Sequence, residues 1–193
     1  ANWRSLYALD KMTGERIWLN DTDNDLRFRS STPAIADESH LLVADNHAIM
    51  LIDAESGEIQ KKTPLDVVGE SLCSSAQPAI EDGIAYVPSA RCGLHAFDMT
   101  TETILWRFDP QPAMVLTGPY SKKGSPTIES SPLVDKGRII FGASDGYIYV
   151  LDKNGKVLSK YFAGSPVLGK VVLADEHIIA STFGGKVVKF KLD

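Results

Sequence analysis

Two cysteines could supply covalent chemistry in this chain. Cys73 and Cys92 flank a predicted β-hairpin whose turn is Asp82-Gly83, and an unbroken register would place them opposite each other. A disulfide between them would indicate an oxidising compartment. The pair would occupy a hydrogen-bonded position, and Pro88 in the second strand is expected to cause a bulge that shifts the register. Two buried thiols are therefore the alternative to this disulfide.

An acidic segment has the alternating spacing with which a calcium-binding loop begins, at Asp21, Asp23 and Asp25. The sixth position of such a loop requires glycine and the twelfth a bidentate glutamate, whereas this chain has Leu26 and Thr32 there. We therefore interpret the segment as a solvated acidic loop and predict no metal site in it.

The histidines show no spacing typical of metal ligands. They lie on or beside different predicted strands, as His40, His47, His95 and His177. The sequence likewise contains no nucleophile elbow, phosphate-binding loop or paired-carboxylate pattern. We therefore assign no catalytic residue and no metal ligand, and favour a protein without catalytic activity.

The elements that would position a site follow a repeated phrase. Residues 6–18, LYALDKMTGERIW, combine a short apolar segment closed by an aspartate, a polar turn and a second apolar segment, which is typical of a β-hairpin. The phrase returns from residues 49, 94 and 148, and we expect its aspartates to accept backbone N–H groups of the turns. These aspartates are Asp10, Asp53, Asp98 and Asp152. Their intervals of 43, 45 and 54 residues indicate a repeat architecture with four short strands per repeat.

The strand pattern predicts an all-β fold, a β-propeller with blades of four antiparallel strands, of which about four are present. The predicted blades are residues 1–20 (partial), 32–62, 76–108, 131–161 and 170–193, the last without its outer strand. Seventeen strands do not close a ring of four-stranded blades, so we interpret the chain as one propeller domain or as the C-terminal segment of a larger propeller. Two copies, each lending residues 15–20 to the other's last blade, would form a homodimer that closes a ring.

The phrase Ala-x-Asp-x-x-Thr-Gly, followed by a strand that ends in Trp, resembles the repeat of pyrroloquinoline-quinone-like (PQQ-like) β-propellers, the quinoprotein alcohol dehydrogenase-like proteins. It is carried by Ala8, Asp10, Thr13, Gly14 and Trp18, and in looser form by Ala96, Asp98, Thr101 and Trp106. We expect Trp18 and Trp106 to dock against neighbouring blades, with each indole N–H bonded to a carbonyl oxygen.

This resemblance indicates the fold more closely than the function, since similar blades occur in quinoprotein dehydrogenases, in an outer-membrane assembly lipoprotein and in accessory domains. We favour a non-catalytic domain for protein–protein interaction or small-ligand sensing, within a larger bacterial envelope protein that is periplasmic or attached to the cell envelope. The alternatives are part of a quinoprotein oxidoreductase and an accessory domain of a hydrolase such as a metallophosphoesterase. An oxidoreductase would need PQQ with calcium, whose ligands we cannot place on residues of this chain.

Composition and loop length narrow the expected partners. A net charge of -5 disfavours a nucleic-acid surface, and no apolar run approaches the roughly 20 residues needed to span a bilayer. The resemblance implies that the loops between second and third strands, and the links between blades, gather on one face. We expect a protein partner or a small ligand there. Residues 109–130 form the longest of these links, either a partner-docking insertion or a packed surface insertion.

Overall fold

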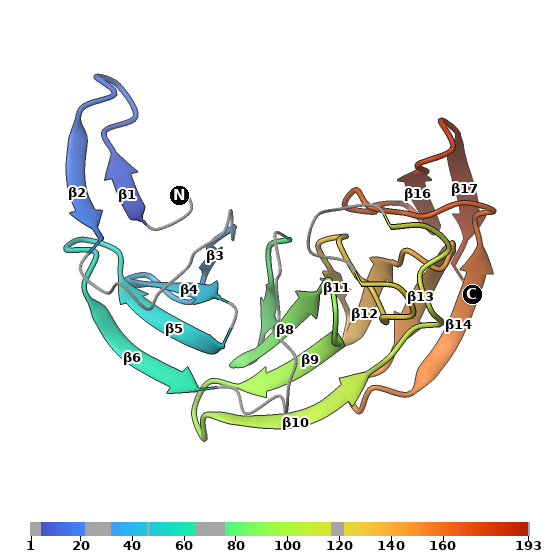
Figure 1. Ribbon diagram of the computed structural model, residues 1–193, viewed down its shortest axis with the longest axis horizontal. Coiled ribbons are helices and arrows are strands. Elements are labelled where there is room, and N and C mark those ends of the chain that lie inside the picture. Colours follow the sequence, from blue (N-terminus) through green and yellow to red (C-terminus); the bar gives the residue numbers. More distant parts are fainter. Residues whose placement is uncertain (1–4, 22–31, 46, 65–75, 117–121, 193) are drawn as a thin grey trace.

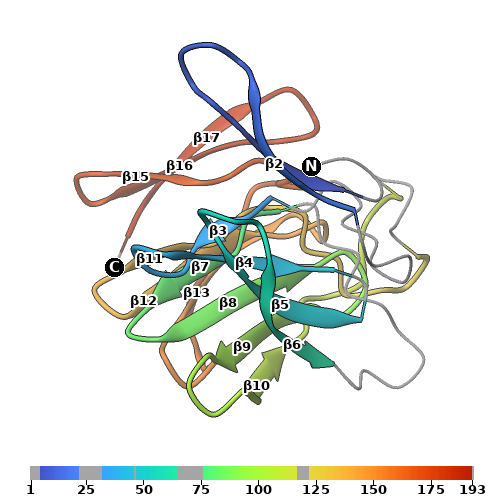
Figure 2. The same cartoon turned by 90° about the vertical axis from the view of Figure 1, so that its left-hand side faces the viewer.

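The computed structural model describes residues 5–21, 32–45, 47–64, 76–116 and 122–192. These residues form five antiparallel sheets that follow one another along a curved arc (Figure 1). The N-terminal and C-terminal sheets lie at the two tips of the arc, and a view from the side shows the blades stacked behind one another (Figure 2). The fold is therefore all-β and is built from propeller blades, as the repeated phrase predicts.

Three of the sheets have four strands each, and the two sheets at the tips are smaller. The first sheet pairs β1 (Leu6–Leu9) with β2 (Arg16–Asn20). The second contains β3 (Ala34–Ile35), β4 (His40–Ala44), β5 (Ala48–Asp53) and β6 (Ile59–Pro64), and the third contains β7 (Ala79–Glu81), β8 (Ile84–Ser89), β9 (Gly93–Asp98) and β10 (Thr103–Phe108). The fourth contains β11 (Leu133–Asp135), β12 (Arg138–Gly142), β13 (Tyr147–Leu151) and β14 (Val157–Phe162). The last contains β15 (Val172–Ala174), β16 (His177–Ser181) and β17 (Val187–Lys191).

The last hairpin of each of the first four sheets is set by the aspartate of the repeated phrase. Asp10 Oδ1 accepts the backbone N–H groups of Met12 and Thr13, both at 2.8 Å. Gly14 then takes a φ of 73°, a left-handed conformation that costs glycine little. The copy at Asp98 has Glu102 in place of this glycine, with a φ of 58°. Local side-chain chemistry therefore fixes these turns.

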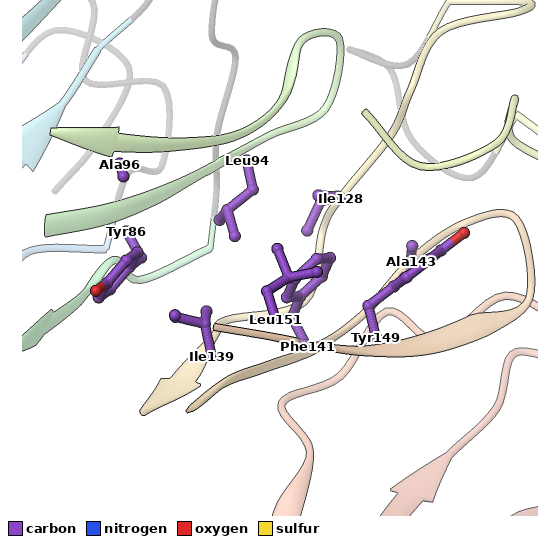
Figure 3. Packing of buried hydrophobic residues seen from close by; sticks show 9 residues of the cluster. All are labelled: Tyr86, Leu94, Ala96, Ile128, Ile139, Phe141, Ala143, Tyr149 and Leu151. Atoms are coloured by element: carbon purple, nitrogen blue, oxygen red, sulfur yellow. The ribbon is translucent and has the colours of Figure 1, made fainter. Parts of the chain in front are cut away.

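The blades are joined by apolar side chains that alternate along each strand. In the largest cluster, Tyr86 and Leu94 from the third sheet pack against Phe141, Tyr149 and Leu151 from the fourth (Figure 3). Similar clusters fill the other three spaces between successive sheets. Because each side chain of a strand points opposite to the next, every complete blade packs against a neighbour on both faces.

Two tryptophans tie the outer strands to the following blade. Trp18 Nε1 donates to the Ala54 carbonyl at 3.0 Å, and its ring lies against Gly57. Trp106 Nε1 donates to the Lys153 carbonyl at 2.8 Å, and its ring lies against Gly155. In both cases the indole covers a turn glycine that has no side chain to displace it.

Pro88 does not shift the strand register, contrary to the bulge expected from the sequence. The pairing of β8 with β9 runs without a break from Ile84 to Ser89, and Pro88 lies opposite Leu94. The other edge of β8 pairs with β7, but this pairing ends at Ala79 opposite Tyr86. Pro88 lies beyond that point, so β7 needs no backbone N–H donor from it. Gln77, further along that edge, donates its backbone N–H to Ser131 Oγ at 2.9 Å.

The sheet faces at the two tips expose positions that the complete blades bury. Tyr7 and Leu9 on β1 are 38% and 51% exposed, whereas Met50 and Ile52, which hold the same positions before the turn aspartate of β5, are fully buried. Val187 on the outward face of β17 is likewise exposed. These tip faces therefore have the character of surfaces that pack between blades.

Candidate functional site

The loops between second and third strands and the described parts of the links between blades share one face of the arc, which we call the loop face. Antiparallel strand order places the remaining turns on the opposite face. In each of the three complete blades, a polar side chain in the loop between the second and third strands accepts backbone N–H groups, as Asp45 does for His47 and Ala48 at 2.7 Å. Ser89 plays this part in the next blade, and Asp145 in the one after it.

The long link after β10 is fastened to the fourth blade by backbone hydrogen bonds. Gln111 donates its N–H to Asp145 Oδ2 at 2.9 Å, and Met114 donates to the Ser144 carbonyl at 2.9 Å. Ala113 donates to the Ser125 carbonyl at 3.2 Å, which joins the two ends of the link. The first part of this insertion therefore has a defined position on the loop face.

Asp145 is the centre of that attachment. Its side chain is 5% exposed, and it also accepts the Tyr147 N–H at 3.0 Å and the Tyr149 hydroxyl at 2.6 Å. Burial and this bond to the carboxylate raise the pKa of Tyr149 well above its usual value, so the phenol remains a donor. The Tyr149 ring in turn packs edge-on against Phe108, from which the link departs. One carboxylate thus connects the link, the loop and the core between blades.

The first part of the link exposes apolar side chains. Met114, Val115 and Leu116 are exposed in succession, and Phe162 at the end of β14 is exposed as well. The space next to Gly146 shows that Met114 lies near Phe162, since a Cβ atom built there would lie 2.8 Å from Met114 Sδ and 3.3 Å from Phe162 Cε2. We call these four residues the loop-face patch. A fixed, exposed apolar group of this kind is typical of a protein contact surface.

The residues of the repeated phrase lie away from this patch, in the turns of the opposite face or in contacts between blades. Backbone N–H bonds to the carboxylates lower the pKa values of Asp10, Asp53 and Asp98. Asp152 accepts the Asn154 and Lys156 N–H groups at 2.9 Å. These aspartates therefore sit where they shape turns, with their oxygen atoms occupied by the backbone.

The other residues with possible chemistry are not brought together in the described part of the chain. Cys92 is buried, and its backbone N–H bonds to Ser89 Oγ at 2.9 Å, while Cys73 lies outside the described residues, so the disulfide stays a prediction. Of the acidic segment only Asp21 is described. His40 Nδ1 lies 2.8 Å from Asp37 Oδ1 at the surface. The described residues contain no group of three or more His, Cys, Asp or Glu side chains that could hold a metal ion.

Asp145 was not singled out from the sequence. The available signal was its place in the repeat, since it follows the second strand of its blade as Asp45 does in an earlier blade.

A helix long and apolar enough to cross a membrane is not found in the described residues.

Comparison with protein families gives a match over almost the whole chain. The family described as outer membrane protein assembly factor BamB matches residues 4–193. BamB of Yersinia pestis is 27% identical over 150 residues, which are 73% of this chain and 34% of that protein. BamB of Shewanella oneidensis is 25% identical over 158 residues, 76% of this chain and 36% of that protein. The chain thus spans about a third of the length of these relatives.

Solved structures show the same fold. The crystal structure of BamB from Moraxella catarrhalis superposes with a TM-score of 0.72 at 21% identity, over 98% of this chain and 55% of that one. The computationally designed Ika4 protein superposes with a TM-score of 0.64 at 16% identity, over 94% of this chain and all of that one.

Proposed function

Because the chain belongs to the family of outer membrane protein assembly factor BamB, we propose that it is a non-catalytic propeller segment that binds a protein partner during outer membrane protein assembly. The proposed binding site is the loop-face patch. Under this proposal the protein lies in the bacterial cell envelope, and residues 1–193 form one segment of a larger propeller.

The proposal rests on one observation: hydrogen bonds fix the position of a loop whose apolar side chains are exposed to solvent. Two anchors on the fourth blade, at Asp145 Oδ2 and the Ser144 carbonyl, fix the link beside the exposed side chains. A loop that is already ordered loses little conformational freedom on binding, which favours affinity. Exposed apolar side chains on such a loop gain free energy when a partner removes them from water.

A photo-crosslinking amino acid at Leu116 would test the proposal in bacterial envelopes. Met12 supplies the control position, because it is an equally apolar and even more exposed residue, 83% against 62%, in a turn of the opposite face. We expect crosslinks from position 116, and not from position 12, to outer membrane proteins or to the factors that assemble them. Crosslinks of the same kind from both positions, or from neither, would contradict the proposed site.

A further inference from the structure

We propose that the loop-face patch recognises a protein segment in which apolar side chains are flanked by aspartate or glutamate. This inference rests on the proposed function and adds the chemistry of the partner. It is carried by the charges that surround the patch.

Three lysines lie around the apolar side chains. Lys160 Nζ sits 4.9 Å from the centre of the Tyr147 ring, and that ring contacts Phe162 of the patch at 4.9 Å between centroids. Lys122 and Lys123 are exposed in a turn that the bond from Ala113 to the Ser125 carbonyl holds beside the link. Cations therefore border the patch on the side of β14 and on the side of the link.

The three lysines form no ion pair within the described residues, and the same holds for several other lysines, among them Lys11 and Lys156. Elsewhere Lys61 pairs with Glu102 at 2.8 Å and Lys153 with Asp82 at 2.9 Å. Exposed lysines therefore surround the apolar loop of a chain whose net charge is -5.

The acidic groups near the patch are already occupied. Asp109 is bound by Arg107 Nε at 2.7 Å, and Asp145 is buried with three donors on its carboxylate. Neither carboxylate forms an ion pair with any of the three lysines. A partner that brings its own carboxylates beside apolar side chains would satisfy both features of the surface.

Screening favours a short protein segment over an anionic membrane as the occupant. The Debye length in physiological salt is about 8 Å, so a short acidic segment interacts with the nearby lysines and little with the rest of the molecule. A bilayer is far broader than the patch, and it would approach the acidic parts of a chain whose net charge is -5.

Two fluorescein-labelled peptides with the same leucine and phenylalanine residues, separated by glutamate in one and by lysine in the other, would test this inference by fluorescence anisotropy. We expect the glutamate peptide to bind about tenfold more tightly at low salt, because several exposed charge pairs contribute modestly and together. The double substitution Lys122→Glu and Lys123→Glu should remove this preference. The matched control is Lys11→Glu with Lys156→Glu, two exposed lysines in turns of the opposite face, which should preserve it.

Equal binding of the two peptides, or a preference that survives the Lys122 and Lys123 substitutions, would overturn the inference. So would binding to vesicles of phosphatidylglycerol without binding to the glutamate peptide. Each of these results leaves the proposed function standing if crosslinks still form from position 116. The absence of those crosslinks would instead refute the proposed function, whatever the peptides do.

Discussion

Replacing Gly155 with alanine should destabilise the protein through the tryptophan that covers it. Gly155 has a φ of 79°, which costs an L-residue roughly 1–2 kcal/mol. The added Cβ atom would lie 2.8 Å from Cδ2 and from Cε3 of Trp106, so the ring must move. Movement of the ring weakens the bond from Trp106 Nε1 to the Lys153 carbonyl, which contributes about 1 kcal/mol. The expected loss in free energy of unfolding is about 2–3 kcal/mol.

Gly14→Ala is the matched control for this substitution. Gly14 has a similar φ of 73° in the equivalent turn of the first hairpin, but no atom lies within 4 Å of an added Cβ. Its replacement should cost only the backbone contribution, about 1–2 kcal/mol. Urea unfolding followed by circular dichroism measures both values. Equal losses at the two positions, or an unchanged excess at Gly155 when Trp106 is also replaced by leucine, would refute the reasoning.

Three further predictions concern the anchor, the turns and the tips of the arc. Asp145→Asn replaces one carboxylate oxygen with an NH2 group, so the bond from the Gln111 N–H should weaken and its hydrogen should exchange with deuterium faster. The free energy of local opening should fall by about 1–3 kcal/mol, whereas Asp45→Asn should leave it unchanged. The Thr101 and Thr100 N–H groups lower the pKa of Asp98 from 3.8, so this carboxylate stabilises the fold above its unfolded pKa and loses that contribution as the pH falls through its folded pKa. Asp98→Asn should therefore flatten the dependence of unfolding free energy on pH below about 4. An unchanged slope would count against the assignment of Asp98 to the turn. The isolated chain should show a mass above 21.0 kDa by light scattering, and Leu9→Lys, but not the equally exposed Leu105→Lys, should lower it towards the mass of one copy.

Local chemistry made the blades predictable from the sequence. The alternation of apolar residues and the turn aspartates act within a few residues, so a phrase such as that at Asp10 specifies its own hairpin. The docking of Trp18 and Trp106 could be expected because repeated hairpins place the ends of outer strands beside the next blade. The homodimer predicted from the strand count stays a prediction.

The attachment of the long link could not be predicted in the same way. Gln111 and Asp145 are far apart in the sequence, and their contact depends on how an insertion folds back across two blades. The prediction of a bulge at Pro88 was wrong for a related reason. The pairing of β7 with β8 ends before Pro88, so the missing N–H group of the proline breaks no hydrogen bond between these strands. Interactions of this kind follow from the tertiary arrangement and not from a local pattern.

Amide hydrogen exchange on the complex with a partner crosslinked from position 116 tests the central claim most directly. The partner should slow exchange in residues 111–116 and 143–147, which form the fixed link and the loop beneath it, and leave the turn at residues 10–14 unchanged. Protection confined to the turns of the opposite face, or to the exposed sheet faces at the tips of the arc, would contradict the assignment of the loop-face patch as the binding site.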